Sequence, residues 1–457
     1  MTLIIVAMLI LAYVLIATGH LTGVNKAAIA MFLGTVGWVV YVCWGADFVM
    51  DQHPDDYLEW LAGNEASSES VKLFIYDHVF LKYVGEAAAI VMFLLATMSI
   101  VELLNNNGCF DFITEWIRTR NSKRLLWTIT LATFILSANL DNLTTATMML
   151  VIMHNILQNS RQRMYVGSAI VLAANCGGCF TVIGDPIGLI LWGDGAVTAS
   201  HLSAYMAIPA ICAWVIPTVL INRELPDRLD CAWSPSPYRG DDTRLNRWQR
   251  VVMLFVGIGG LWFIPTFHNI TKLAPFLGAL CVLAVLWVVN EAFNRKLIAA
   301  DQMSQRRIPM SLQYGSLQQV LFVMGIMLGM GVVTETGVWS DVAAWFDTYI
   351  HDIWLMGIGA GLLSSIVDTF TIAVSNISLY SVGVGEVAAN GAYWKVIAYT
   401  TAVGGCLLSV GSVSGLALMK AEHVTLGWYV KHLTPKVLLG WIIGFCVLWM
   451  EINIMEL

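Results

Sequence analysis

The chain has 457 residues, of which 58% are hydrophobic and 12% are charged, and its formal net charge is −7 at pH 7. Because a soluble domain carries about 25% charged residues, this composition excludes an ordinary water-soluble protein and indicates a chain surrounded mostly by membrane lipid. The nine cysteines show no metal-ligand spacing, and the sequence has neither a phosphate-binding glycine loop nor an HExxH motif. We therefore expect no cofactor, no nucleotide and no nucleic-acid partner.

Ten apolar runs are long enough to cross a hydrocarbon core about 30 Å thick, which takes roughly 20 helical residues. No basic segment precedes the first run, which we interpret as a membrane helix rather than a cleavable signal peptide. The sequence therefore predicts an all-α polytopic membrane protein. The ten runs lie near 3–18, 26–45, 84–104, 165–193, 203–222, 250–266, 274–293, 317–335, 394–418 and 436–452.

Two further apolar stretches, 125–157 and 353–380, each have an aspartate near the middle. Each arm beside the aspartate has about 12 to 16 residues, or about 18 to 24 Å of helix, which is too short to cross the membrane. We therefore expect two re-entrant hairpins, with Asp141 and Asp368 at their tips.

The two halves of the chain match at one constant separation. Residues 136–144 recur as 363–371, a shift of 368 − 141 = 227, and the same shift relates 177–179 to 404–406. In each half the aspartate is followed, about 36 residues later, by a glycine-broken segment. Duplicated breaks of this kind mark the central site of a transporter.

The distribution of charge predicts the topology, because Lys and Arg accumulate in cytoplasmic loops. Basic residues flank both ends of the first hairpin and enrich the loop 223–249, whereas the loop 46–82 is acidic. We expect the loops 223–249 and 294–316 to be cytoplasmic, and the loop 46–82 and both termini to be external. Five spans separate equivalent points of the two halves. Because this number is odd, the second half should cross the membrane in the opposite direction, so the repeats should be inverted.

These boundaries divide the chain into scaffold segments and two repeat cores. The predicted parts are N-terminal scaffold helices with an acidic external loop (1–83), a first repeat core (84–222) with hairpin 125–157 and broken helix 165–193, a cytoplasmic Arg-rich loop (223–249), further scaffold helices with a cytoplasmic loop (250–316), and a second repeat core (317–457) with hairpin 353–380 and broken helix 394–418.

Carboxylates at membrane depth are the strongest candidates for chemistry, because a charge there is costly and faces a partner or a watery cavity. Asp141 and Asp368 are surrounded by hydroxyls and amides, and Asp185 lies in the first broken helix. Such oxygens, with free backbone carbonyls, suit a hard cation such as Na⁺. The alternative is that the aspartates are helix caps. The candidate cation or proton ligands are Asp141, Asp368, Asn142, Thr144, Thr145, Asn175, Asp185, Ser364, Thr369, Ser409 and Ser412.

A second group of titratable residues lies outside these motifs. Glu102, Glu335 and His154 are candidates for a proton path. An interfacial position for the glutamates, and a structural role for the histidine, are the alternatives.

At residues 137–145 and 173–178 the chain resembles the NhaD-type sodium/proton antiporters of the ion-transporter superfamily. The resemblance implies a scaffold and a transport domain with two opposed hairpins. It also implies exchange of Na⁺ or Li⁺ for H⁺ by alternating access across a bacterial cytoplasmic (inner) membrane. Carried over by position, it implicates Asp141, Asn142, Asn175, Asp185, Ser364, Asp368, Ser409 and Ser412.

The sequence departs from the pattern of these antiporters in two places. Thr369 stands where the pattern commonly has asparagine, and residues 186–188 stand where it favours threonines. Both departures lower the number of polar ligands, so the transported ion and its stoichiometry stay open. Scaffold domains of this type often dimerise, which makes a homodimer a candidate assembly.

Two other functions fit parts of the pattern. A transporter of the same fold could carry an oxyanion or a carboxylate, but an anion site would prefer neutral hairpin tips at helix N-termini. An intramembrane aspartyl protease also uses two carboxylates, but its usual Tyr-Asp and Gly-x-Gly-Asp contexts are absent from this sequence. We therefore expect a secondary transporter rather than an enzyme.

Overall fold

The computed structural model describes residues 2–62, 65–232, 245–293 and 310–455, which are helical apart from the connections between helices. Eight helices of this part are long and apolar enough to cross a membrane, which confirms the predicted all-α polytopic architecture. They coincide with eight of the ten predicted runs. The other two runs, 165–193 and 394–418, are each interrupted, as predicted, at 181–185 and at 405–412. The predicted break at 175–178 is wrong, because these residues stay inside the first helix of their run and its interruption begins only after Phe180.

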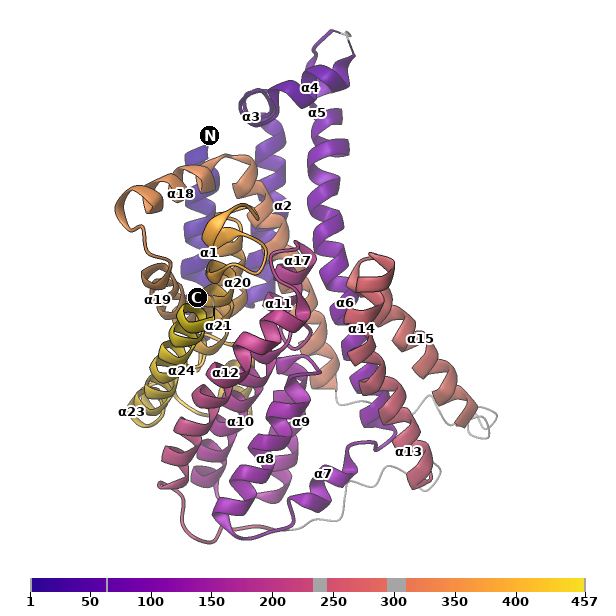
Figure 1. The fold of residues 1–457 in the computed structure, drawn as a ribbon, viewed down its shortest axis with the longest axis vertical. Coiled ribbons are helices and arrows are strands. Elements are labelled where there is room, and N and C mark those ends of the chain that lie inside the picture. Colours follow the sequence, from indigo (N-terminus) through magenta and orange to yellow (C-terminus); the bar gives the residue numbers. More distant parts are fainter. Residues whose placement is uncertain (1, 63–64, 233–244, 294–309, 456–457) are drawn as a thin grey trace.

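In one group of helices, the scaffold bundle, α17 packs on α2 and α6, α1 packs on α2, and α15 packs on the other side of α6 (Figure 1). The backbones approach closely where Gly34 faces Gly325, since a Cβ added to Gly325 would lie 2.5 Å from the backbone of Ala30. Small residues allow such contact between membrane helices. The bundle contains α1 (Thr2–Thr22), α2 (Lys26–Cys43), α6 (Leu81–Asn106), α13 (Arg247–Leu254), η3 (Phe255–Gly259), α14 (Gly260–Thr271), α15 (Pro275–Phe293) and α17 (Met310–Glu335).

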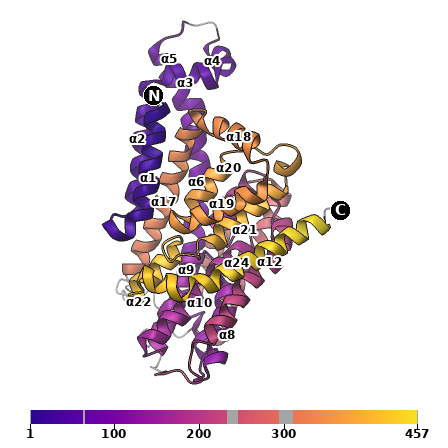
Figure 2. The ribbon, with the colours of Figure 1, turned by 90° about the vertical axis from the view of Figure 1, so that its left-hand side faces the viewer.

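The remaining long helices form a second group, the hairpin bundle, in which α12 packs on α24, α8 on α10, and α19 on α21. Figure 2 shows this bundle beside α1, α2 and α17. It contains α8 (Ser122–Ser137), α9 (Asn142–Ile156), α10 (Ser160–Phe180), α11 (Pro186–Gly193), α12 (Ala199–Asn222), α19 (Ile353–Ile366), α20 (Thr369–Ile377), α21 (Ala392–Gly404), α22 (Val413–Glu422), α23 (Leu426–His432) and α24 (Thr434–Met455).

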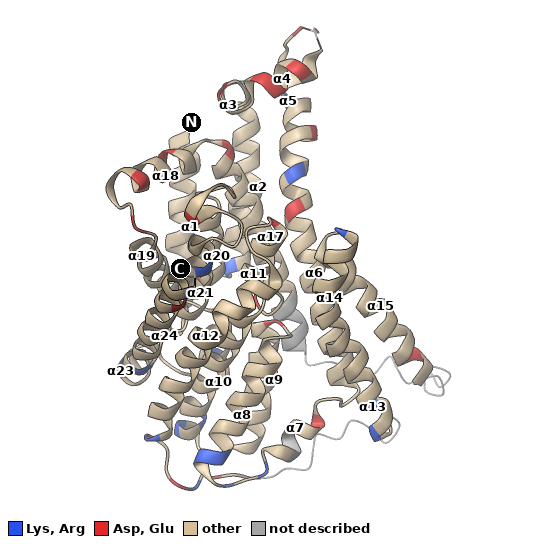
Figure 3. Cartoon of the chain, viewed as in Figure 1, with Lys and Arg blue, Asp and Glu red and all other residues tan. Residues whose placement is uncertain are grey.

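Short helices lie at the two ends of the molecule. Acidic residues gather at the end that holds α3 to α5, and basic residues at the opposite end, where α8 begins (Figure 3). Parts of the two predicted cytoplasmic loops, residues 233–244 and 294–309, lie outside the described residues. The short helices are α3 (Gly45–Gln52), α4 (Pro54–Leu61), α5 (Ser68–Phe74), η1 (Ile75–Phe80), α7 (Asp111–Trp116), α18 (Val338–Tyr349) and η5 (Gly385–Val387).

Close backbone contacts recur at the shift of 227 found in the sequence. A Cβ added to Gly177 would lie 2.4 Å from the carbonyl oxygen of Phe134, and one added to Gly404 would lie 2.5 Å from the carbonyl oxygen of Gly361. These four positions are related in pairs, since 404 − 177 and 361 − 134 both equal 227. In both halves, therefore, glycine lets the first hairpin arm rest directly on the helix that ends at the break.

Side-chain hydrogen bonds repeat in the same way. The Ser137 hydroxyl donates to the carbonyl oxygen of Ala174 at 2.6 Å, and the Ser364 hydroxyl donates to that of Thr401 at 3.1 Å. Both donors and both acceptors are again 227 residues apart. The repeat is thus one of tertiary contacts as well as of sequence.

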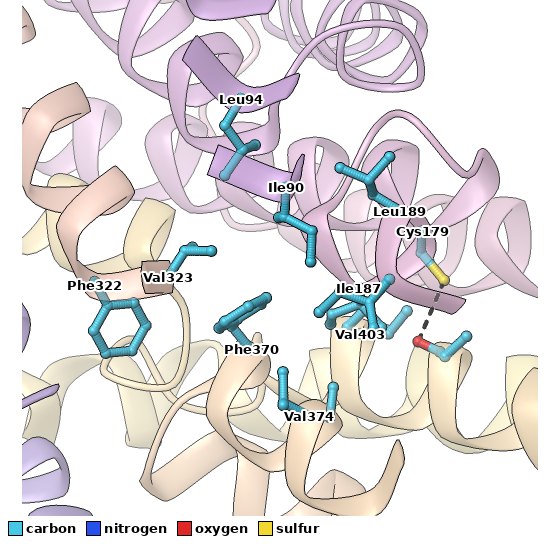
Figure 4. Close-up of a cluster of buried hydrophobic side chains, with 14 of the residues drawn as sticks. Ile90, Leu94, Cys179, Ile187, Leu189, Phe322, Val323, Phe370, Val374 and Val403 are labelled. Atoms are coloured by element: carbon cyan, nitrogen blue, oxygen red, sulfur yellow. Dashed lines mark hydrogen bonds between the residues drawn. The ribbon is translucent and has the colours of Figure 1, made fainter. Parts of the chain in front are cut away.

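The scaffold bundle and the hairpin bundle meet on an apolar surface beside the hairpin tips (Figure 4). Helices α6 and α17 supply one side of this surface, and α11, α20 and α21 supply the other. Apolar contacts are not directional, so these side chains add no hydrogen bonds between the two bundles. The labelled side chains that form it are Ile90, Leu94, Phe322 and Val323 from the scaffold bundle, and Ile187, Leu189, Phe370, Val374 and Val403 from the hairpin bundle.

Candidate functional site

Each hairpin turns at a buried aspartate that caps the second arm. Asp141 is 3% exposed, and its Oδ2 accepts hydrogen bonds from the backbone N–H and hydroxyl of Thr144 at 3.0 and 3.2 Å. Asp368 is fully buried, and its Oδ2 accepts from the N–H groups of Phe370 and Thr371 at 3.1 and 3.3 Å. The capping role considered for both residues is therefore present. It uses one oxygen of each carboxylate and leaves Oδ1 for other partners.

The Oδ1 atoms of the two aspartates have different partners, both from the scaffold bundle. Gln319 on α17 donates from Nε2 to Asp141 at 2.9 Å. The Lys26 ammonium, at the start of α2, lies 3.4 Å from Asp368 Oδ1. The first hairpin thus faces a neutral amide and the second a positive charge.

Two further oxygens near Asp141 are buried without a hydrogen-bond partner among the described residues. They are Oε1 of Gln319 and Oγ1 of Thr145, from side chains that are 6% and 0% exposed. A buried oxygen without a partner costs free energy unless a donor or a cation satisfies it. Carboxylate, amide and hydroxyl oxygens are the ligand types that a hard cation prefers.

Asp185 adds a third carboxylate to this region. It caps α11 by accepting from the N–H of Ile187 at 3.0 Å, and its Oδ2 accepts from Nδ2 of Asn142 at 2.8 Å. Asp141 and Asp368 lie near enough to Asp185 to interact with it electrostatically. The three aspartates predicted from the sequence therefore belong to one region of the molecule.

A chain of hydrogen bonds connects the two broken helices through this region. Asn142 Nδ2 lies 3.5 Å from Asn175 Oδ1, and Asn175 Nδ2 donates to Ser414 Oγ at 2.7 Å. The hydroxyls of Ser414 and Ser412 are 3.2 Å apart. Ser412 caps α22 at the position that corresponds to Asp185 in the repeat, since 412 − 185 = 227. The polar residues of the two halves thus meet at one place.

Three of the predicted ligands make contacts of a different kind. Ser364 donates its hydroxyl to backbone carbonyls on α19 and α21. Thr369 binds Gly411 through its backbone N–H at 3.0 Å, and the Ser409 hydroxyl lies 3.2 Å from the sulfur of Met419. These residues hold the second hairpin and the second break in position.

The candidate proton-path residues lie at other places. Glu335 ends α17, where it bonds His53 and Tyr83 at 2.7 Å each and lines a cavity next to α3 to α5. His154 on α9 bonds Glu422 at 2.7 Å. Glu102 is partly buried on α6. The hydrogen bonds of Glu335 and His154 thus join them to groups other than the three aspartates.

Two residues that face the aspartates are absent from the predicted ligands, namely Lys26 and Gln319. Both signals are weak in the sequence: a lysine at the start of an apolar run, and a glutamine inside another. A third scaffold contact joins the hydroxyls of Tyr13 on α1 and Ser375 on α20. These partners depend on how the two bundles pack, which the local sequence does not encode.

Comparison with known proteins places the chain among transporters. The family model described as "Citrate transporter" (CitMHS) matches residues 1–404. Sodium/proton antiporter 2 of Arabidopsis thaliana is 27% identical over 435 residues, which cover 95% of this chain and 96% of that protein. The Na⁺/H⁺ antiporter NhaD of Vibrio cholerae is 26% identical, over 83% of this chain and 81% of that protein. Sodium/proton antiporter 1 of Arabidopsis thaliana is 29% identical over 79% of this chain, which spans 61% of that relative's length.

Proposed function

Since the chain belongs to the CitMHS family of secondary transporters, we propose that it exchanges Na⁺ or Li⁺ for H⁺ across a bacterial cytoplasmic membrane. The names of relatives that align over most of the chain support sodium/proton exchange. The geometry of the hairpin tips supports a cation as the cargo. The proposed exchange uses the gradient of one ion to move the other.

The observation that carries this proposal is the set of buried oxygens around the first hairpin tip. Asp141, Asp185, Gln319 and Thr145 all contribute side-chain oxygens to this region, and two of these oxygens have no partner among the described residues. A dehydrated alkali cation is satisfied by such oxygens, whereas a carboxylate or oxyanion would be repelled by the aspartates. A proton on one of the carboxylates is the alternative to the cation, which makes the two ions compete.

We further propose that α8–α9 and α19–α20 are re-entrant hairpins of two inverted repeats. The longest of these four helices, α8, has 16 residues, or about 24 Å of helix, which is less than the roughly 30 Å of a bilayer core. The acidic and basic ends seen in Figure 3 support an external α3–α5 end and a cytoplasmic end at the start of α8. The termini are proposed to be external, as expected from the number of spans.

Alternating access would arise from movement of the hairpin bundle against the scaffold bundle. The apolar surface between the bundles supports such movement, because apolar contacts are not directional. The three polar contacts at Lys26, Gln319 and Tyr13 would break or change as the bundles move. A homodimer formed through outer scaffold helices is part of this proposal, and cross-linking in membranes would test it.

The proposal is tested by measuring Na⁺-induced release of a preformed proton gradient in everted membrane vesicles. Asp141→Asn and Asp368→Asn should each abolish the release, because the amide cannot alternate between a proton and a cation. Asp77→Asn, a variant in η1 of the acidic external segment, is the matched control and should keep wild-type exchange. Unchanged exchange by either hairpin variant would remove that aspartate from the mechanism.

The description of the matched family favours one second candidate, a transporter of citrate or another carboxylate. Such a substrate would need a cation bound first, because the aspartates alone repel it. Uptake of labelled citrate into vesicles, with and without Na⁺, separates the two functions. Uptake that depends on Na⁺, together with no Na⁺-induced proton release, would replace the antiport proposal.

A further inference from the structure

The Lys26 ammonium lies among three oxygen atoms at the tip of the second hairpin. Its Nζ is 3.4 Å from Asp368 Oδ1, 3.4 Å from the carbonyl oxygen of Val367 and 3.2 Å from that of Val410. The lysine side chain is 14% exposed and the aspartate side chain 0%. The charge is therefore held inside the protein and not at its surface.

These three oxygens come from the parts of the second repeat where the helices are interrupted. Val367 directly follows α19 at the hairpin turn, and Val410 lies between the end of α21 at Gly404 and the start of α22 at Val413. Carbonyls of interrupted membrane helices are free to bind a cation. One carboxylate and two such carbonyls therefore form a cation site, and the ammonium group lies in it.

The ammonium is held loosely. Charge-assisted N–H to oxygen bonds are commonly about 2.7 to 2.9 Å long, whereas all three distances here are 3.2 Å or more. Lysine is a compact charge on a flexible stem, so it can withdraw from the oxygens by rotating its own side chain. A free cation could therefore replace it without a change in the backbone.

In the first repeat, the described residues place no such charge at the matching position. Asp141 receives a hydrogen bond from the neutral amide of Gln319 at 2.9 Å. The capping bonds of the two aspartates are otherwise equivalent, since Asp141 accepts from the N–H of Thr144 and Asp368 accepts from the N–H of Thr371. The partner from the scaffold is thus the main difference between the two hairpin tips.

We propose that Lys26 is a tethered cation that occupies the site at Asp368 and competes with the transported monovalent cation for it. The inference rests on the proposed function, because it assumes that the cargo is a cation. Lys26 belongs to the scaffold bundle and Asp368 to the hairpin bundle, so the ammonium also ties the two bundles together. A cation that displaces the ammonium breaks this contact between the bundles. Cation binding is thereby coupled to movement of the bundles.

The test is a titration of the purified full-length protein with NaCl, followed by thermal stability, at about pH 8, where free aspartates are ionised. Choline chloride keeps the ionic strength constant. Lys26→Gln and Lys26→Met should lower the half-saturating Na⁺ concentration by about tenfold, because the competing charge is gone. Lys26→Arg, which keeps a charge, should not tighten Na⁺ binding. Lys72→Gln on α5, an exposed position, is the matched control for charge removal and should behave like the wild type.

A double variant tests whether the effect acts through Asp368. Lys26→Gln combined with Asp368→Asn should show the same Na⁺ dependence as Asp368→Asn alone. If Lys26→Gln leaves Na⁺ binding unchanged or weakens it, the lysine only neutralises the aspartate and the inference is wrong. The two neutral variants differ in polarity, so a folding defect of one leaves the other to be measured.

Failure of the proposed function gives a different result. In that case wild-type vesicles show no Na⁺-induced proton release. The competition is still supported if Lys26→Gln gains stabilisation by Na⁺ that the double variant lacks. A third result would overturn the competition by Lys26 and leave the proposed exchange intact. In it, wild-type vesicles exchange Na⁺ for H⁺, but neither neutral Lys26 variant changes Na⁺ binding.

Discussion

The side-chain amide of Asn142 donates a hydrogen bond to Asp185 across 2.8 Å, and so joins the first hairpin to the first broken helix. Asn142 is the first residue of α9, directly after Asp141. Asp185 is the residue that caps α11. One bond thus fixes the positions of two carboxylates relative to each other.

Removal of this donor should weaken cation binding. Asn142→Ala leaves Asp185 with only the N–H of Ile187 as its hydrogen-bond donor among the described residues. Loss of a hydrogen bond to a charged group costs about 1.5 to 3 kcal/mol, so the half-saturating Na⁺ concentration for proton release should rise at least about tenfold. The matched control is Asn139→Ala in the same turn, because the Asn139 amide bonds the carbonyl oxygen of Ile135 instead. Equal effects of the two variants would contradict a specific role for Asn142.

Alanine at the paired glycines should destabilise both halves of the hairpin bundle. A Cβ at position 177 or 404 would lie 2.4 or 2.5 Å from a backbone oxygen of the facing hairpin arm. Backbone cannot move aside as a flexible side chain can, and overpacking costs about 1 to 3 kcal/mol. Gly177→Ala and Gly404→Ala should therefore lower the midpoint of thermal unfolding in detergent by several degrees, each by a similar amount.

The control for these variants is Gly193→Ala at the end of α11. A Cβ there meets no atom within 4 Å, so the unfolding temperature should stay near that of the wild type. A drop as large as that of Gly177→Ala would show that the effect does not depend on the close contact.

A buried ion pair should stabilise the connection between α10 and α22. Glu422 has a side chain 1% exposed, and it accepts hydrogen bonds from Nε of Arg163 at 2.6 Å and from His154 at 2.7 Å. Removing one partner of a buried pair costs about 3 to 5 kcal/mol, because the other charge stays unpaired. Arg163→Met should therefore lower stability strongly, as measured by chemical unfolding in detergent.

The histidine of the same cluster provides the comparison. The side chain of His154 is 53% exposed, so water can replace its bond to Glu422. His154→Ala should cost much less stability than Arg163→Met. The reverse order would mean that the histidine, and not the arginine, neutralises the glutamate.

The contact between His53 and Glu335 should make the α3–α5 end of the protein sensitive to pH. The hydrogen bond to Glu335 raises the pKa of His53 above its ordinary value, and nearby Asp56 acts in the same direction, while burial acts against them. A raised folded-state pKa contributes stability that is fully present below about pH 6.5, the pKa of unfolded histidine, and is lost as pH rises through the folded-state value. The NMR titration of His53 should therefore have its midpoint above that of a free histidine.

Glu335→Gln removes the carboxylate that raises this pKa and should lower the midpoint of the His53 titration. Asp56→Asn should have a smaller effect, because the Asp56 side chain is 75% exposed and lies 3.6 Å away. An unchanged midpoint in Glu335→Gln would show that the short contact does not control the protonation of His53.

The repeat and its two aspartates could be predicted from the sequence because their determinants are local. An aspartate caps a helix by binding N–H groups two or three residues later, so the motif at 136–144 and its copy at 363–371 specify both hairpin turns. The repeat also places a glycine at 177 and at 404, where the two helices are in close contact. Only a residue without a Cβ permits these contacts. Charge and hydropathy predicted the membrane spans, and the glycine-rich segments predicted that two of the runs are interrupted.

The partners of the aspartates were decided by tertiary packing alone. Gln319 is 178 positions from Asp141, and Lys26 is 342 positions from Asp368. A side chain that projects from one bundle into another has no periodicity or spacing that ties it to its target, because its position follows from how α17 packs against the hairpins and how α2 packs against α17. The sequence by itself thus determined which carboxylates stand at the two hairpin turns, whereas the fold decided that one of them faces an amide and the other an ammonium group.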